Sequence, residues 1–318
     1  MEISVYLKEI ARRTADARAL ERAEAADLLG QILDGECTDL ALGAFCVAMR
    51  IKGETPQEMA GFLDAVQPRL RRLPRADRPA VTLPCYNGAR KLPALTPLLA
   101  LLLARKGLPV LVHGMPTEDG RVSSQAVLSC LGVQPQPATQ ALLSGQVHFV
   151  ATESLHPGLK RLLDVRRVTG VRNLAHSLVK LIQPVDGPAL VVGCHTHPDY
   201  GELMAATLQL TGGHAMLLHG AEGEPVADPR RVPRMSVFLD GRARIVQENQ
   251  AGPLTSLPAL PARIDSVSTA NYIRAVLNGD LPAPAPILLQ AEHIERACKA
   301  IEAGYQPGAS SSQQGRAA

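Results

Sequence analysis

Cationic side chains are concentrated between Lys160 and Lys180, where the sequence reads KRLLDVRRVTGVRNLAHSLVK. Guanidinium and ammonium groups clustered on one rigid element can neutralise the phosphates of a polyanion, so this segment predicts a nucleic-acid-binding surface. The same pattern is also typical of a solvated helix face that binds nothing. The candidate phosphate-binding residues in this segment are Lys160, Arg161, Arg166, Arg167, Arg172 and Lys180, against the single acid Asp164.

A helix must hold these cations in place. Leucines recur with the i, i+4, i+7 spacing over 174–181, which predicts one packed helix face. Arg172, His176 and Lys180 follow an i, i+4, i+8 spacing and would share another side of the same helix. We therefore expect helix over about 158–182, with its apolar side buried and its cations directed to solvent.

A second basic segment covers 68–91 and carries seven basic residues against one acid, a net charge of +6. Its last two cations, Arg90 and Lys91, lie in a loop and complete the set of candidate nucleic-acid-binding residues. The segment 156–182 carries a net +5, and the whole chain only +3, so the remaining residues sum to −8. Two basic segments on an otherwise acidic chain favour a localised polyanion site, although each segment could be merely solubilising.

Composition narrows the recognition mode and the compartment. Aromatic residues make up only 3% of the 318 residues and Trp is absent, which argues against base stacking on aromatic platforms. The six cysteines form no CxxC pair, so we expect reduced thiols in a cytoplasmic protein. We also expect no signal peptide, because the first residues lack an apolar run, and no membrane span.

The pattern of apolar segments predicts an α/β protein: a small helical N-terminal domain plus a larger α/β domain with a mostly parallel sheet flanked by helices. The expected domains are 1–75, helical; 76–305, α/β; and 306–318, a disordered Ser/Gln/Gly-rich tail. Strands are predicted at 81–83, 109–112, 147–150, 189–192 and 215–218, with a hairpin over 237–239 and 243–248.

Other residues offer weaker chemical signals. The loop after the first predicted strand has a single glycine, Gly88, where a phosphate cradle needs several. The motif Cys194-His195-Thr196-His197 resembles part of a zinc site, but no second ligand pair with suitable spacing supports it. Cys85 has no base beside it in the sequence, so an inert buried thiol is the simpler interpretation. We predict no catalytic residue, no metal and no cofactor.

The order of these elements and several loops resemble the anthranilate phosphoribosyltransferase family, glycosyltransferase family 3, over roughly residues 5–281. The resemblance implies a nucleoside phosphorylase/phosphoribosyltransferase-like fold, with the helical domain completed by helices near 158–183. It is carried by Val112-His113-Gly114, by Val122-Ser123-Ser124, by Gly170-Val171-Arg172-Asn173 at the position of the family's anthranilate-binding arginine, and by His219-Gly220 with Glu222-Gly223.

The departures from the family fall on its reactive groups. The family's Gly-Thr-Gly-Gly-Asp diphosphate loop stands here as Tyr86-Asn87-Gly88-Ala89-Arg90. The family's loop lysine and asparagine are replaced by Val112 and Met115, and its magnesium-binding Asp-Glu pair by Pro225-Val226. Magnesium needs carboxylate oxygens, which Pro and Val cannot supply. These losses argue against phosphoribosyl transfer.

The motifs Tyr86-Asn87-Gly88-Ala89-Arg90-Lys91, Gly170-Val171-Arg172-Asn173 and His197-Pro198 are similar to those of the YbiB-type branch of this family. That resemblance implies a homodimer formed through the helical domain and nucleic-acid binding, to DNA and possibly RNA, with little sequence preference. Two alternatives stay open: a phosphoribosyltransferase or nucleoside phosphorylase with atypical loops, and a dimeric scaffold for another protein.

Overall fold

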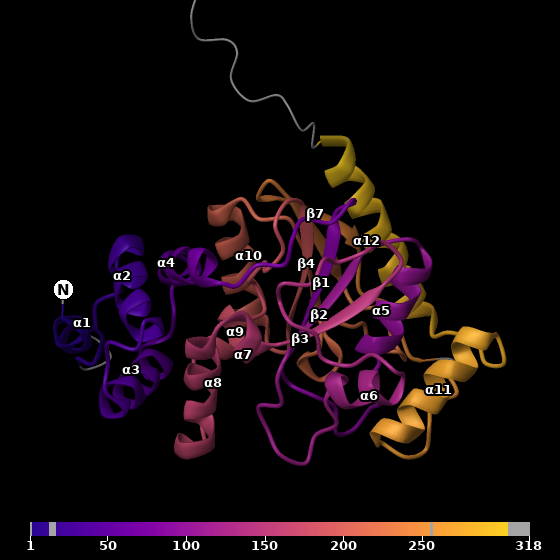
Figure 1. Ribbon diagram of the computed structural model, residues 1–318, viewed down its shortest axis with the longest axis horizontal. Coiled ribbons are helices and arrows are strands. Elements are labelled where there is room, and N and C mark those ends of the chain that lie inside the picture. The colour runs from indigo at the N-terminus through magenta and orange to yellow at the C-terminus, as the bar shows by residue number, and fades with distance from the viewer. Residues whose placement is uncertain (1, 13–16, 255–256, 305–318) are drawn as a thin grey trace, which may run out of the picture.

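The computed structural model describes residues 2–12, 17–254 and 257–304. Figure 1 shows a helical unit, α1 to α4, packed beside an α/β unit built around one twisted sheet. The tail predicted to be disordered, 306–318, lies outside the described residues. No helix in the described part of the chain is both long enough and apolar enough to cross a bilayer.

The helical unit consists of α1 (Ile3–Ile10), α2 (Arg22–Leu33), α3 (Asp39–Lys52) and α4 (Pro56–Val66), followed by a 3-10 turn, η1 (Gln67–Arg69). Helix α4 begins with a capping box, in which Thr55 and Glu58 bond each other's backbone N–H groups, and with Pro56 in its first turn. Glu58 is fully buried and also receives the ammonium group of Lys52 at 2.7 Å.

Helix α8 (Pro157–Thr169) packs against α2 and α3 (Figure 1). The expectation of one continuous helix to residue 182 is wrong. Gly170 adopts a left-handed conformation, with φ 73°, and its N–H bonds the carbonyl of Arg166, which ends α8. The chain then turns inward and forms the short α9 (Ala175–Leu178), in which Ala175, His176 and Leu178 are buried.

The sheet has seven strands in the order β3-β2-β1-β4-β5-β6-β7. The first five strands in this order pair in parallel, and β6 pairs antiparallel with both β5 and β7. The sheet is therefore mostly parallel, as the sequence predicted. The near-continuous apolar character of the five parallel strands reflects burial on both faces, whereas most of β7 is exposed. The strands are β1 (Ala80–Cys85), β2 (Val110–Gly114), β3 (Val147–Ala151), β4 (Ala189–His195), β5 (Ala215–His219), β6 (Met235–Leu239) and β7 (Arg242–Gln247).

Two hydrophobic clusters cover the two faces of the sheet. One cluster joins the sheet to the helical unit, α8 and α10 (Pro198–Thr211), through side chains such as Leu111 and Leu217. The other joins it to the remaining helices through side chains such as Val110 and Val192. Those helices are α5 (Thr96–Arg105), α6 (Ser124–Cys130), α11 (Ser266–Asn278) and α12 (Ala285–Gly304); the short α7 (Thr152–Leu155) and η2 (Ala221–Gly223) lie between strands and helices.

Two ion pairs on α4 predict very different contributions to stability. Glu58 and Lys52 are both buried, and Glu58 Oε1 also accepts the N–H of Leu20 at 2.9 Å. Glu58→Gln should lower the free energy of unfolding by about 3 to 5 kcal/mol, because it leaves Lys52 buried without its counter-charge. Asp64→Asn breaks the exposed pair with Arg22 and should cost about 1 kcal/mol or less. Chemical denaturation of both variants measures the difference, and equal losses would contradict it.

Candidate nucleic-acid interface

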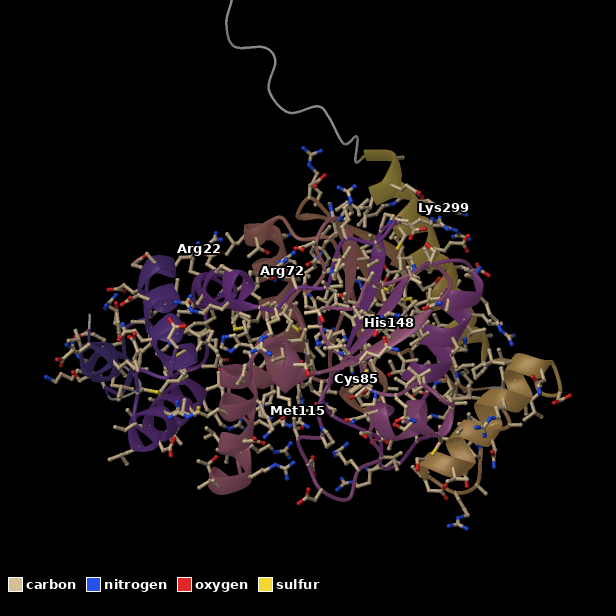
Figure 2. All side chains as sticks on the ribbon, viewed as in Figure 1. Arg22, Arg72, Cys85, Met115, His148 and Lys299 are labelled. Carbon is tan, nitrogen blue, oxygen red and sulfur yellow. The ribbon has the colours of Figure 1, made fainter. Side chains whose placement is uncertain are left out.

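The loops that carry the candidate site meet at the carboxyl edge of the sheet. Cys85 and Gly114, the last residues of β1 and β2, are register partners. Figure 2 labels Cys85 and Met115 in the region where β1 and β2 end. His113 is fully buried there, and burial lowers the pKa of its imidazole to about 3. Its Nδ1 lies 3.0 Å from the hydroxyl of Tyr86, so a neutral histidine is hydrogen-bonded to the first residue of the loop after β1.

The loop after β1 offers a run of backbone N–H groups, which we call the amide cradle: those of Asn87, Gly88, Arg90, Lys91 and Leu92. The outer three converge on the carboxylate of Glu222. Arg90 N–H donates to Oε2 at 2.8 Å, and the next two N–H groups donate to Oε1 at 2.6 and 2.7 Å.

The inner part of the amide cradle is bound by a second carboxylate. Glu224 Oε1 accepts the N–H groups of Asn87 at 2.7 Å and Gly88 at 2.9 Å, and its Oε2 accepts the Ser124 hydroxyl at 3.0 Å. Glu224 is almost fully buried. Every donor of the amide cradle is therefore bonded to a side chain of this same chain.

Beside the cradle, three arginines surround one carboxylate; we call them the arginine cluster. Glu118 receives Arg121 and Arg166 at 2.9 Å each, and Arg172 lies 4.0 Å away. Burial lowers the pKa of the Arg172 guanidinium, and the charges of Arg166 and Arg121 lower it further. Arg166 also keeps one buried nitrogen without a protein partner. Arg121 also lies 3.3 Å from Glu222, so the three guanidiniums face two carboxylates and keep one net positive charge.

A small basic pocket adjoins the arginine cluster at the seam between the helical and α/β units. Its volume is ≈140 Å³, below the range of pockets that hold drug-sized ligands. None of the described residues that line it is Asp or Glu. The buried Nε2 of His176 has no protein partner. The lining comprises Arg50, Arg172, Asn173, His176, Ser177, Lys180, Cys194, His195, Thr196, His197, Tyr200 and Met204.

The expected position of Lys180 on an exposed helix face is wrong, and so is that of His176. Lys180 is 6% exposed and donates to the carbonyls of Gly223 at 2.8 Å and Cys194 at 3.3 Å. It lines the bottom of the basic pocket and connects the α9 segment to the loop after β5. His176 is 5% exposed because the chain after Gly170 turns into the core.

The remaining predicted cations lie at the surface with different partners. On α8, Lys160 pairs with Asp164 at 2.5 Å, while Arg161 reaches Asp39 of α3 at 2.7 Å. Arg167 pairs with Asp119 at 3.1 Å and with Asp164 at 3.2 Å. The side chains of Arg90 and Lys91 are exposed, and neither forms an ion pair with another residue that the structure describes.

Arg50 and Arg121 were not predicted as members of the site, because both lie outside the two basic segments and come close to the site only in the folded chain. Arg50 comes from α3 and donates to the carbonyl of Arg172 at 3.2 Å. The two glutamates of the cradle were also absent from the predicted binding residues, although Glu222 was named among the residues that carry the family resemblance. A signal for them existed: two acids flank Gly223 in a loop that follows a buried strand, where ligands usually bind.

The possible zinc motif does not assemble. His195 and His219 stack edge to face with ring centroids 5.8 Å apart, while His214 lies 3.7 Å from Asp240. Among the described residues, no group of three or more His, Cys, Asp or Glu is placed to hold a metal ion. Cys85 is buried, and burial raises the pKa of its thiol well above the ordinary value.

Comparison with known proteins supports the same scaffold. Residues 8–68 match the family model described as glycosyl transferase family, helical bundle domain. The chain is 38% identical over 297 residues to the uncharacterized protein YbiB of Escherichia coli (strain K12), covering 91% of this chain and 92% of that one. It is 30% identical over 282 residues to the anthranilate phosphoribosyltransferase of Anaeromyxobacter dehalogenans (strain 2CP-C), covering 85% and 82%.

Solved structures show the same fold. The anthranilate phosphoribosyltransferase from Thermus thermophilus matches with a TM-score of 0.68 and 21% identity, covering 93% of this chain and 95% of that one. The Saccharomyces cerevisiae enzyme in complex with PRPP and Mg matches with a TM-score of 0.66 and 15% identity, covering 96% and 89%. At these identities the likeness concerns the fold alone.

The buried His176 of the basic pocket should make the free energy of unfolding depend on pH. Burial, together with the nearby charge of Arg172, lowers the pKa of His176 from an ordinary 6.5 to about 3. Because the unfolded chain binds this proton more readily, stability falls as the pH drops below 6.5. Between about pH 7.5 and about pH 5.5 the wild type should lose about 1.4 kcal/mol more than His176→Gln. Urea unfolding at both pH values measures this, and parallel pH profiles would contradict it.

Proposed function

Because the chain belongs to the glycosyl transferase family that includes YbiB and the anthranilate phosphoribosyltransferases, we propose that it uses this scaffold to bind nucleic acid with little sequence preference. The observation that carries the proposal is the arginine cluster joined to a basic pocket without carboxylates. Three guanidiniums that face two carboxylates, Glu118 and Glu222, leave positive charge that a phosphate can neutralise.

The arginine cluster suits phosphate better than an ordinary surface pair does. Arginine presents donors in a planar fork that matches phosphate oxygens, and it keeps its charge when partly buried. Arg166 has a buried donor without a protein partner, and Arg172 faces the pocket as well as Glu118. A backbone phosphate placed here would meet at least two guanidiniums held by the fold.

The other surface cations extend the proposed basic groove. Arg167 is held by Asp119, whose side chain is 93% exposed, so this pair is weak and can be exchanged for a phosphate. Arg90 and Lys91 add exposed charges from the loop after β1. Lys160 and Arg161 lie farther along α8, each with an acid. Lys180 contributes positive potential from within the pocket rather than a contact on its surface.

Low sequence preference follows from the kinds of groups present. Phosphate contacts position a strand without reading its bases. Tyr200 is the one Phe, Tyr or Trp among the described residues that line the pocket, and the chain has no Trp, which limits stacking on large aromatic side chains. We also propose a cytoplasmic location, on the basis of six cysteines that are all free.

Phosphoribosyl transfer is the second candidate, favoured by the retained His113 and Arg172. The magnesium and diphosphate that this family's chemistry involves do not fit the residues present. Pro225 and Val226 occupy the positions of the magnesium-binding acids, and Val226 is buried. The two nearby carboxylates, Glu222 and Glu224, are bonded to the amide cradle. Turnover of phosphoribosyl diphosphate with anthranilate and magnesium would replace our proposal with this one.

Replacing Arg166, Arg167 and Arg172 together by Ala should weaken binding to all sequences alike, by about tenfold or more near 100 mM salt. The log–log dependence of affinity on salt should flatten by about 0.7 to 0.9 for each phosphate that is no longer neutralised. Filter binding or fluorescence anisotropy with several unrelated oligonucleotides measures both effects.

A matched control removes three exposed cations elsewhere: Arg263, Arg296 and Lys299, the last labelled on α12 in Figure 2. The control variant should bind as the wild type does. Equal weakening in both variants would indicate general charge rather than a site. Loss on one sequence only, or binding that ignores salt, would contradict non-specific phosphate binding.

We further propose a homodimer formed through the helical unit. Helix α3 exposes an apolar stripe at Leu40, Val47 and Ile51, which are 85%, 38% and 66% exposed. An adjoining hollow of ≈460 Å³ between α1 and α3 is lined in part by Ile10 and Ala48. An apolar stripe of this kind is typical of a protein interface, and a second copy would align two basic grooves.

Ile51→Asp should dissociate the proposed dimer, because it places an unpaired charge in an apolar interface. We expect the dissociation constant to rise by about 100-fold or more, equivalent to about 2.7 kcal/mol. Leu257→Asp is the control, since Leu257 is 68% exposed and lies outside the stripe. Sedimentation or light scattering gives the mass. A wild-type chain that is monomeric at high concentration, or an Ile51→Asp variant with unchanged mass, would reject this interface.

A further inference from the structure

Glu222 occupies a position that local conformation alone does not favour. It lies in the η2 turn with φ 52°, in the left-handed region that a residue with a long side chain seldom adopts. The next residue, Gly223, has φ 82°, and a Cβ there would approach Asn87 Nδ2 to 1.9 Å. Asn87 Nδ2 in turn donates to the carbonyl of Glu222 at 2.9 Å. The turn is therefore shaped and held so that the Glu222 carboxylate enters the amide cradle.

The outer cradle has the properties of an anion site. Three successive N–H groups, those of Arg90, Lys91 and Leu92, point at one pair of oxygens. Successive backbone N–H groups of this kind form concave sites for phosphate and other anions. Cationic side chains surround the site: those of Arg90 and Lys91 are exposed beside it, and Arg121 Nη1 lies 3.3 Å from Glu222 Oε2.

Glu222 and Glu224 differ in how firmly they are held. Glu224 is 3% exposed and also binds the Ser124 hydroxyl at the start of α6, so it belongs to the core. The side chain of Glu222 is 15% exposed, and its carboxylate bonds to the three backbone N–H groups and Arg121, donors that a phosphate could equally use. Its backbone strain is relieved if the turn relaxes, which lowers the cost of moving it.

We propose that Glu222 is an internal anion that closes a latent phosphate-binding site, and that the ligand class of the opened site is a phosphate or diphosphate group. With the carboxylate in place, its negative charge and its bonds to three N–H groups exclude an external anion. When the carboxylate is removed, the same three N–H groups and the cations of Arg90, Lys91 and Arg121 are left for phosphate oxygens. This proposal does not depend on nucleic-acid binding.

The test is a gain of binding. Asn tolerates the left-handed conformation and is neutral and too short to reach the cradle, so Glu222→Asn is the informative variant. Calorimetric titration with inorganic pyrophosphate, and separately with inorganic phosphate, should show binding at least about tenfold tighter than in the wild type, equivalent to about 1.4 kcal/mol. Amide NMR shifts at Arg90, Lys91 and Leu92 should accompany it.

Glu292→Asn, on α12, is the matched control, because it removes one partly exposed carboxylate that pairs with Arg296. It should leave pyrophosphate affinity unchanged. A folded Glu222→Asn variant that gains no affinity, or a control that gains as much, would overturn the proposal.

Glu222→Gln is the second variant, because it keeps the length of the side chain and removes only the charge. We expect a smaller gain, since its amide oxygen still accepts one N–H. If neither variant folds, Glu222 is a required part of the core and not a displaceable anion, which also rejects the proposal. Nucleic-acid binding is measured on the same samples, so failure of the proposed function is visible separately.

Discussion

The carboxyl edge of the sheet depends on two carboxylates that bind backbone N–H groups. Glu224 joins the loop after β1 to the loop after β5, although β4 lies between these strands. It also holds Ser124 at the start of α6. Without such acceptors, each buried N–H would cost about 1 to 3 kcal/mol. The same bonds that complete the fold therefore also occupy the donors that a diphosphate would need.

A transferase of this family must both bind an anionic substrate and position its reacting groups and metal, and these two requirements differ in the precision that they need. Catalysis requires the reacting groups and the metal to be positioned with near-atomic precision. Binding a polyanion requires only cations held along a surface, because most of the free energy comes from released counterions. Pro225 and Val226 supply no carboxylate for a metal, whereas the arginine cluster and the basic pocket hold cations together, and our proposal of polyanion binding rests on that arrangement.

The sheet was predictable because buried parallel strands read as short apolar runs, and each predicted strand coincides with an observed one within a few residues. The helix over 158–182 was not, because its leucine spacing continues past Gly170, where the backbone ends α8. The burial of Lys180 depends on the carbonyl of Gly223, 43 residues later in the chain. Contacts of that range leave no periodic trace in the sequence, and the same holds for Arg50 and Glu222.

Folding also changes what the charge pattern means. The segment 156–182 has a net +5 in the sequence, but Asp39, Glu118 and Asp119 come from elsewhere to pair with its arginines. That reduces the local net charge to +2; Arg50 and Arg121 raise it, and Glu222, which pairs with Arg121, lowers it to +3. These paired acids come from α3 and from the loop after β2, while Arg50, Arg172 and Lys180 line a pocket that has no Asp or Glu among its described lining residues. The described lining of this pocket therefore carries cations without a carboxylate, whereas the cations that the sequence concentrates on α8 are paired with acids.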